Sequence, residues 1–373
     1  MNPSSGRPLT ICQVVPALEG GGVERGTLEV AQALVKQGHN SIVVSTGGRL
    51  AKTLLRQGSR HFTLPIGKKS LTTLRCIYPL RRILKTEGVD ILHVRSRLPA
   101  WVARWAWKRL PEAHRPHLVS TVHGLYSVSA YSAIMTRTER VIAVSETVRE
   151  YLLKNYPKLD PKRIRVIHRG IDSNAFPLGY QPTHDWLLGW YRRFPMLEGR
   201  PVILLPGRLS RIKGHDDFIQ LMARLQAAGS NAVGLIVGGY DSRKQRYIDE
   251  LQKSIQTLEL ENIVFAGHQN DMREIYATSD LVLSLSSKPE SFGRTVIEAL
   301  SIGTPVIGYD HGGVGETLGL AFPLGRVPLR DIDELTNRVM SFLARPPTIE
   351  SPPPFALQDM TDKTIHLYKE LIA

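Results

Sequence analysis

Short apolar runs alternate with longer amphipathic stretches along most of the 373-residue chain. The run at 9–15 is rich in β-forming residues, and the apolar spacing over 23–37 predicts an amphipathic helix that ends at Gly38. Further short runs in this part predict strands at 41–45, 91–94, 118–122, 141–144 and 164–167. Strands that alternate with helices indicate a parallel sheet covered on both faces.

A stretch rich in turn-forming residues, SNAFPLGYQPTH at 173–184, interrupts this pattern and is interpreted as a linker. A second series of apolar runs predicts strands at 202–205, 233–237, 263–266, 281–285 and 305–308. The proline-rich stretch RPPTIESPPP at 345–354 precedes a last helix at about 359–372. We expect an α/β protein with two doubly wound parallel-sheet domains facing a cleft, because such sheets bind ligands at the carboxyl ends of their strands.

The composition, with 42% hydrophobic and 22% charged residues, is that of an ordinary globular protein. No apolar run approaches the roughly 20 residues of a membrane span, and the first residues do not resemble a secretory signal. Cys12 and Cys76 are too few for a disulfide framework and do not have the spacing of metal ligands. These features predict a cytoplasmic protein.

The positive charge is concentrated in the first half of the chain. Residues 1–175 contain 28 Lys and Arg against 11 Asp and Glu, a net charge of +17, whereas residues 176–373 have a net charge of −3. Such asymmetry suggests an anionic partner for the first half, either nucleic acid or an acidic membrane surface.

Two loops after predicted strands contain residues suited to anion binding. In PALEGGGVERG, 16–26, three consecutive glycines precede a helix, whose positive end favours anions, although a flexible turn fits nearly as well. In LPGRLSRIKGH, 205–215, Arg208 and Lys213 could hold a diphosphate. A solvated basic loop is the alternative interpretation of this second motif.

The segment PESFGRTVIEALSIGTPVI, 289–307, carries two glutamates that a plain surface helix would not require. Glu290 precedes a predicted helix at about 292–302, and Glu298 lies among apolar residues within it. Their axial offset is about 10 Å at 1.5 Å per residue, enough for one carboxylate to hold a sugar and the other a ribose. Alternatively, Glu290 caps the helix and Glu298 forms a surface ion pair.

These motifs resemble the retaining glycosyltransferases of family 4, whose hallmark is two glutamates separated by seven residues. Glu290 and Glu298 have that spacing, and Phe292 and Gly293 match the family's F-G pair. The family's G-R-x-x-x-x-K-G element is complete at Gly207, Arg208, Lys213 and Gly214. The glycine loop, STVHG at 120–124 and VIHRGID at 166–172 follow in the family's order, so the resemblance covers nearly the whole chain.

The resemblance implies a GT-B fold of two Rossmann-like domains. Residues 1–175 would form the acceptor-binding domain, completed by a C-terminal helix at 355–373 that crosses back to it, and residues 176–354 would bind the nucleotide-sugar donor. The residues implied in catalysis are His123, Arg208, Lys213 and Glu290. The donor contacts would further include Gly21, Gly22, Gly207, Gly267, His268, Ser291, Phe292, Gly293, Arg294 and Glu298.

Within this resemblance, Arg208 and Lys213 would bind the diphosphate, Glu290 the transferred sugar and Glu298 the ribose. Gly267 and His268 would lie near the nucleobase, and His123 near the reacting centre. Two motifs depart from the family pattern: GGYDS at 238–242 replaces the common G-D-G-P, and His168 and Arg169 stand where Pro-Asn is frequent.

The implied activity is transfer of a sugar from a UDP- or GDP-sugar to a hydroxyl of a glycan or lipid-linked acceptor, as in the synthesis of lipopolysaccharide or another envelope glycan. No cofactor and no metal are expected, because no D-x-D motif at a predicted strand end suggests a metal-held diphosphate. Alternatives on the same fold are a nucleotide-sugar epimerase and a sugar-phosphate synthase. A nucleic-acid-binding protein is a remote alternative, and no nucleic acid is expected as a partner because no compact RNA-binding module is apparent.

The basic half predicts peripheral attachment at the inner face of the cytoplasmic membrane; the alternatives are that these charges bind acceptor phosphates or only keep the protein soluble. The candidate contact regions are the basic stretch at 67–85 and the tryptophan-rich helix at 99–110. Trp101, Arg104, Trp105 and Lys108 share one face of that helix, although a buried helix with snorkelling ends fits equally well.

Overall fold

The computed structural model describes residues 7–239 and 245–373, which fold into two compact units. The first unit comprises Met1–Arg169 with Leu357–Ala373, and the second comprises Gly170–Ala356. The chain therefore passes between the units six residues earlier, and returns two residues later, than the sequence suggests. Ile171 donates its backbone N–H to Phe355 (2.8 Å) and forms a β-bridge with Ala356, which joins the two crossing segments to each other. The ring of Phe355 in turn packs against Phe292 of the second unit.

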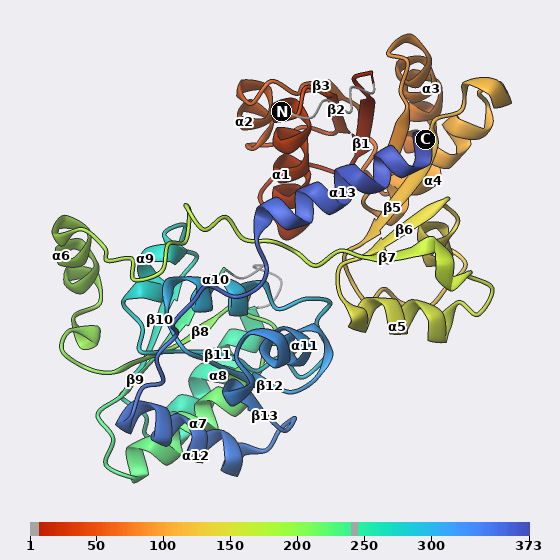
Figure 1. Ribbon diagram of the computed structural model, residues 1–373. Coiled ribbons are helices and arrows are strands. Elements are labelled where there is room, and N and C mark those ends of the chain that lie inside the picture. Colours follow the sequence, from red (N-terminus) through yellow and green to blue (C-terminus); the bar gives the residue numbers. More distant parts are fainter. Residues whose placement is uncertain (1–6, 240–244) are drawn as a thin grey trace. The chain divides into compact units, whose positions relative to one another are not determined.

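The first unit contains a seven-stranded parallel sheet in the order β3-β2-β1-β4-β5-β6-β7 (Figure 1). Its strands are β1 (Thr10–Val14), β2 (Asn40–Ser45), β3 (Arg60–Thr63), β4 (Ile91–Val94), β5 (His117–Val122), β6 (Arg140–Ala143) and β7 (Ile164–Val166). Its helices are α1 (Gly22–Lys36), α2 (Ala51–Arg56), α3 (Ile77–Thr86), α4 (Arg97–Lys108), α5 (Glu146–Asn155) and α13 (Leu357–Ile372). Short 3-10 turns, including η1 (Leu71–Cys76), η3 (Ser132–Thr136) and η4 (Pro161–Arg163), complete it.

The C-terminal helix α13 packs against α1 in the first unit, as expected from the resemblance (Figure 1). Met360 and Tyr368 of α13 are buried in a core cluster with Ile11, Ile91 and Ile142 of the sheet. The hydroxyl of Tyr368 also lies 2.6 Å from Nδ1 of the buried His93. The last helix is therefore part of the first unit's core.

The second unit contains a six-stranded parallel sheet in the order β10-β9-β8-β11-β12-β13. Its strands are β8 (Val202–Pro206), β9 (Val233–Val237), β10 (Ile263–Gly267), β11 (Leu281–Ser284), β12 (Val306–Tyr309) and β13 (Arg326–Val327). Its helices are α6 (His184–Arg193), α7 (His215–Ala227), α8 (Gln245–Thr257), α9 (Met272–Ala277), α10 (Arg294–Ile302), α11 (Gly312–Ala321) and α12 (Ile332–Ala344). Helices α7, α8 and α12 pack together, whereas α9, α10 and α11 form a separate row (Figure 1).

Both sheets reverse their strand order beside their first strand, which confirms the predicted doubly wound architecture. In the first unit β1 lies between β2 and β4, and in the second unit β8 lies between β9 and β11. The connections on the two sides of such a reversal leave in opposite directions, which opens a crevice at the carboxyl ends of the two central strands. In the second unit, the loops after β8 and β11 meet there.

The predicted linker at 173–184 is instead a packed part of the second unit. Phe176 and Tyr180 pack against that unit's core, and the backbone N–H of Gly179 donates to the carbonyl of Ile302 (2.9 Å). The strands β3 and β13 were not predicted, because three of the four residues of β3 are polar and β13 has only two residues.

Two glycines at the ends of α7 adopt left-handed backbone conformations for different reasons. Gly214, before the helix, has φ +76°, and a Cβ there would lie 2.0 Å from the carbonyl oxygen of Leu285. Gly229, after the helix, has φ +77°, and a Cβ there would meet nothing within 4 Å. Gly214 is therefore required by the close approach of the loop after β11 as well as by its dihedral angle.

We expect Gly229→Ala to cost about 1–2 kcal/mol of unfolding free energy, the penalty of a left-handed alanine. Gly214→Ala should cost about 1–3 kcal/mol more, because the backbone at Leu285 must also move. Urea unfolding of the two variants measures this difference. Equal destabilisation of the two variants would show that the loop after β11 can move at no cost in free energy.

Candidate active site

The loop after β8 is held against the loop after β9 by backbone contacts. Gly207 donates its N–H to the carbonyl of Val237 (2.8 Å), and Leu209 donates to the carbonyl of Gly239 (3.1 Å). A Cβ at Gly238 would lie 1.9 Å from the carbonyl oxygen of Gly207, so only glycine fits there. The contact fixes the backbone on both sides of Arg208, whose exposed side chain makes no hydrogen bond or ion pair with the described residues.

Lys213 and Glu290 form an ion pair across the crevice between β8 and β11. The Nζ atom of Lys213 lies 2.8 Å from Oε1 of Glu290, and both side chains are about a quarter exposed (26% and 28%). Ser286, also in the loop after β11, donates its hydroxyl to the same carboxylate oxygen. The site therefore joins a cation and a carboxylate from two strand ends, as the motifs predict.

The backbone around Glu290 is fixed by the loop after β12. His311 donates its Nε2–H to the carbonyl of Ser286 (2.6 Å), and Gly313 donates its N–H to the carbonyl of Glu290 (2.7 Å). A Cβ at Gly313 would lie 2.5 Å from the backbone nitrogen of Phe292. Three loops, after β8, β11 and β12, thus determine where the Glu290 carboxylate lies.

Glu298 is buried within α10, with 6% of its surface exposed. Its Oε1 accepts from Nε of Arg294 (2.9 Å), one turn earlier, and its Oε2 accepts from the hydroxyl of Tyr276 in α9 (3.0 Å). The Glu298 carboxylate is therefore buried, although Arg294 is partly exposed, and the alternative of a surface pair is wrong. The alternative that Glu290 caps the helix is also wrong, because the N-cap is Gly293, without a side-chain cap.

The helices α7, α10 and α11 begin beside this crevice with N-caps that supply no side-chain hydrogen bond. These N-caps are Gly214, Gly293 and His311. The backbone N–H of Gly293, predicted to contact the donor, lies 3.4 Å from the Thr317 hydroxyl, a long contact. Helix ends without side-chain caps leave N–H groups and a positive end for an anion.

The remaining predicted donor contacts lie around this crevice. Phe292 is buried, with its ring edge-to-face against Phe355 at 5.5 Å, and Ser291 is half-buried beside Glu290. Gly267 and His268 are exposed at the end of β10, two strands from β8. At about 4.8 Å between strands, that end lies roughly 10 Å from the diphosphate position, a distance that a nucleoside can span.

Gly21, Gly22 and His123 lie in the first unit, where Arg169 connects two of them. Gly21 caps α1 and Gly22 begins it. Arg169 donates from Nη2 to the carbonyl of Gly22 (2.8 Å), and its Nη1 lies 3.3 Å from Nδ1 of His123. A Cβ at Gly26 would lie 2.6 Å from Nη2 of Arg169, so the helix needs glycine there to admit the guanidinium.

His123 is neutral in this setting. Burial, then the positive charges of Arg95 and Arg169, lower the pKa of His123 well below its ordinary value. Since a guanidinium only donates hydrogen bonds, Nδ1 of His123 accepts and the ring proton lies on Nε2. In this tautomer the neutral imidazole can donate a hydrogen bond from Nε2–H beside the glycine loop.

Several residues of the site were not predicted from the sequence. Ser286 and Tyr276 donate to the two glutamates, and His311 donates to the carbonyl of Ser286. No motif distinguishes these residues; the only signal for Ser286 and His311 is their position in loops after strands. Arg169 could have been found, because it departs from the family's pattern. The departure at 238–242 falls partly on 240–242, which lie outside the described residues.

Among the described residues, no three His, Cys, Asp or Glu side chains are grouped to hold a metal ion. In the same part of the chain, no helix has both the length and the apolar character needed to cross a bilayer.

Comparisons with known proteins match both halves of the chain. A family model described as Glycosyltransferase Family 4 matches residues 20–175, and one described as Glycosyl transferases group 1 matches residues 192–352. A solved glycosyltransferase from Rickettsia africae is 30% identical, with a TM-score of 0.85 over 98% of this chain and 99% of that one. The first unit and the second unit thus each resemble a glycosyltransferase domain.

Two further relatives are more distant or partial. The mannosylfructose-phosphate synthase of Agrobacterium fabrum is 34% identical over 244 residues, which cover 63% of this chain but only 51% of that protein. The Anabaena protein HepE, solved with UDP and glucose, is 20% identical, with a TM-score of 0.80 over 97% of this chain and 99% of that one. At this identity, the second likeness shows the fold alone.

His215, the first residue of α7, is a buried neutral histidine beside Lys213. The residue is 1% exposed, and its Nδ1 lies 3.3 Å from the hydroxyl of Tyr247. Burial, and then the charge of Lys213, lower the pKa of His215 to about 4, against a hydrogen bond with the backbone of Ser210 that raises it.

We expect this histidine to make stability depend on pH between about 6.5 and 4. The unfolded chain binds a proton below pH 6.5 and the folded chain does not, so its contribution is present above pH 6.5 and is lost as the pH falls. Between pH 7 and 5 the wild type should lose about 2 kcal/mol more unfolding free energy than His215→Gln. Denaturant unfolding at both pH values measures this difference. If the wild type and His215→Gln lost the same unfolding free energy, His215 would be protonated in the folded state at pH 5.

Proposed function

Because the chain belongs to glycosyltransferase family 4, we propose that it transfers a sugar from a nucleoside-diphosphate sugar to a hydroxyl of a glycan or glycolipid acceptor, with retention at the anomeric carbon. The observation that carries this proposal is the Lys213–Glu290 pair at the carboxyl ends of β8 and β11. A cation for the leaving diphosphate and a carboxylate for sugar hydroxyls lie next to each other where a doubly wound sheet binds its ligand.

In the free chain, Lys213 and Glu290 neutralise one another. A partly exposed pair of this kind contributes about 1 kcal/mol or less to stability, so its exchange for ligand contacts costs little. The donor diphosphate would bind Lys213 and the neighbouring Arg208, and the sugar hydroxyls would donate hydrogen bonds to Glu290. The pair thus holds both side chains in place until the donor replaces it.

The transition state of sugar transfer develops negative charge on the leaving diphosphate. Arg208, Lys213 and the helix N-termini beside the crevice supply positive charge there, so we propose that the reaction needs no metal ion. The leaving phosphate oxygen would take the acceptor proton on the same face, which leaves both glutamates free to bind hydroxyls. Turnover that is lost in EDTA and restored by Mg²⁺ or Mn²⁺ would contradict this part of the proposal.

We propose a UDP- or GDP-sugar as the donor. The fold shared with HepE, solved with UDP and glucose, supports UDP as the first nucleotide to test. The acceptor we propose is a phosphate-bearing or lipid-linked glycan, as in lipopolysaccharide synthesis, because the first half of the chain carries the net positive charge. The site of action would then be the cytoplasmic face of the membrane.

A second candidate is a sugar-phosphate synthase, in which the acceptor is a hexose phosphate. It is supported by the identity with the mannosylfructose-phosphate synthase. Product analysis separates the candidates: a synthase yields a phosphorylated disaccharide, a glycan transferase an elongated glycan, and an epimerase only a nucleotide-linked isomer. Proton NMR of the product also gives the anomeric configuration, and inversion would contradict retention.

We expect Lys213→Ala to lower kcat/KM about 30- to 1,000-fold, equivalent to about 2–4 kcal/mol, because a preorganised cation is lost from the transition state. Glu290→Gln should lower kcat at least tenfold and leave nucleoside diphosphate binding intact, since it weakens only contacts to the sugar. Release of nucleoside diphosphate from the cognate donor measures both.

The matched control is Lys253→Ala, which removes an exposed lysine from α8 in the same unit and should change neither parameter. An effect of Lys213→Ala no larger than that of Lys253→Ala would show that Lys213 is only a surface charge.

We propose that the stretch from Lys68 to Arg82 attaches the enzyme peripherally to anionic lipid. In this stretch Leu71 is 85% exposed and Tyr78 is 65% exposed, close to the exposed Lys68 and Arg82. Apolar side chains next to cations favour an anionic interface, where each cation contributes about 1 kcal/mol. The tryptophan-rich helix α4 is a weaker candidate, because two of its indole N–H groups donate to the carbonyls of Tyr131 and Pro116.

We expect the protein to sediment with anionic vesicles at low salt and to be released as salt is added. Neutralising Lys68, Lys69, Arg81 and Arg82 together should abolish the binding, because the charge near the leaflet is lost. Neutral vesicles serve as the control. Equal binding to neutral and anionic vesicles, or none to anionic ones, would rule out an electrostatic attachment.

A further inference from the structure

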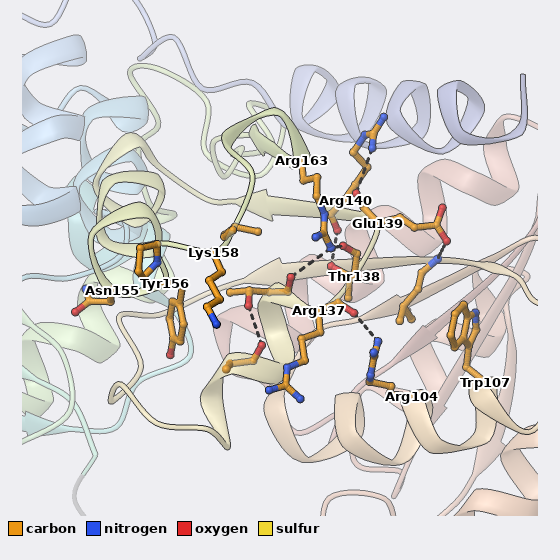
Figure 2. A pocket seen from close by; sticks show the side chains of 15 residues that line it. Arg104, Trp107, Arg137, Thr138, Glu139, Arg140, Asn155, Tyr156, Lys158 and Arg163 are labelled. Atoms are coloured by element: carbon orange, nitrogen blue, oxygen red, sulfur yellow. Dashed lines mark hydrogen bonds between the residues drawn. The ribbon is translucent and has the colours of Figure 1, made fainter.

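The first unit contains a cationic pocket at the amino ends of its strands, whereas the glycine loop and His123 lie at the carboxyl ends (Figure 2). Its volume of about 860 Å³ is within the range of small-molecule sites. It forms where strands begin: Leu118 starts the buried part of β5, and Arg163 directly precedes β7. His123 follows the other end of β5, so roughly 16 Å of strand separates it from Leu118.

Five cations line this pocket: Arg140, at the start of β6, and four more from four other segments. Arg104 belongs to α4, Arg137 follows η3, Lys158 follows α5 and Arg163 ends η4. Arg104 and Arg163 are half-buried, whereas Arg137 and Lys158 are exposed. Figure 2 shows the side chains of Arg137 and Lys158 extending toward the same open space.

The two half-buried arginines are fixed by backbone carbonyls. Arg104 donates from Nη1 to the carbonyl of Arg137 (2.8 Å), and Arg163 donates from Nη2 to the carbonyl of Thr138. A guanidinium has five N–H donors, so each of these arginines keeps donors for a ligand while its position is set by the chain. The arrangement is preorganised for an anion.

No carboxylate among the described residues is within ion-pairing distance of these four cations. Glu139 also lines the pocket, but its oxygens accept from Nδ1 of His117 (2.7 Å) and from the backbone N–H of Leu118 (3.3 Å). Burial, and then the charges of Arg137 and Arg163, lower the pKa of Arg104, a sign of like charges brought together. An anion in the pocket would relieve this repulsion.

We propose that this pocket binds a phosphate-bearing ligand at a site separate from the donor crevice. Phosphate oxygens accept parallel hydrogen bonds from the N–H groups of a guanidinium. Four cations suit a ligand group with two or more negative charges. Trp107 and Leu159 give the wall an apolar part, on which a ring or an acyl chain can pack. The phosphate can belong to a soluble metabolite or to a lipid headgroup, and the two sources are distinguished below.

The test measures inorganic pyrophosphate binding by calorimetry in an Arg208→Ala/Lys213→Ala background, which removes the proposed diphosphate site of the second unit. We expect saturable binding in this background, weakened at least tenfold by Arg137→Gln/Lys158→Gln. Both substitutions are at exposed positions and should leave the fold intact, which a thermal melt checks. The matched control is Lys154→Gln/Lys162→Gln, which neutralises two exposed lysines beside the pocket and should change the affinity less than twofold.

The proposal would be overturned if pyrophosphate did not bind in this background. It would also be overturned if Arg137→Gln/Lys158→Gln and Lys154→Gln/Lys162→Gln bound pyrophosphate with equal affinity. The arginines would then have a structural role only. Because the donor residues are already removed, this result does not bear on the proposed transferase activity. Vesicles of phosphatidylglycerol then identify the source of the phosphate. Release of bound protein by pyrophosphate, beyond that caused by chloride of equal ionic strength, assigns the pocket to a lipid headgroup; unchanged binding assigns it to a soluble phosphate.

Discussion

The strand order of the second sheet places the loops after β8 and β11 side by side, and the candidate active site depends on this placement. The chain runs outward from β8 in one direction and, after β11, in the other, so only these two central strands leave an open crevice at their carboxyl ends. Lys213 comes from one loop and Glu290 from the other, and their 2.8 Å contact spans the crevice. If either residue followed another strand, the two side chains could not form this ion pair.

The close approach of these loops explains why the site is rich in glycine. Gly207, Gly214, Gly238 and Gly313 lie where a Cβ would crowd a neighbouring side chain or collide with the backbone of a neighbouring loop. The same approach brings helix N-termini to the crevice, which adds positive potential to that of Arg208 and Lys213. The acidic side chains are balanced locally, Glu290 by Lys213 and Glu298 by Arg294, so the free site is held together by pairs that a ligand can replace in part.

Much of this organisation could be predicted from the sequence, because fully buried parallel strands are continuous apolar runs. The strands at 91–94 and 233–237 were predicted to the residue, whereas the polar edge strand β3 and the two-residue β13 carry no such signal. The segment at 173–184 has the composition of a linker, but Phe176 and Tyr180 make it part of the second unit's core. The composition of a segment indicates that it forms turns, but it does not indicate whether its side chains pack into a core.

The motifs predicted the charged residues of the site but not their supports. The burial of Glu298 could be suspected from its apolar neighbours, and the two loops of Arg208 and Glu290 from their places after strands. Ser286, His311 and Tyr276 could not be predicted. Ser286 lies in the same loop as Glu290, but no motif distinguishes it. Tyr276 contacts Glu298 from another helix, and His311 contacts the carbonyl of Ser286 from the loop after β12, so both contacts depend on the fold. Local patterns therefore identify the chemistry, whereas the geometry that orients it depends on the fold.

The central claim is that the second unit binds the donor diphosphate where Lys213 and Glu290 now pair. A crystal structure with UDP or GDP, whichever binds in calorimetry, tests it most directly. The account predicts diphosphate oxygens within hydrogen-bonding distance of Arg208 and Lys213, the ribose hydroxyls on Glu298, and Lys213 drawn away from Glu290. A nucleotide bound elsewhere, with the Lys213–Glu290 pair intact, would contradict it.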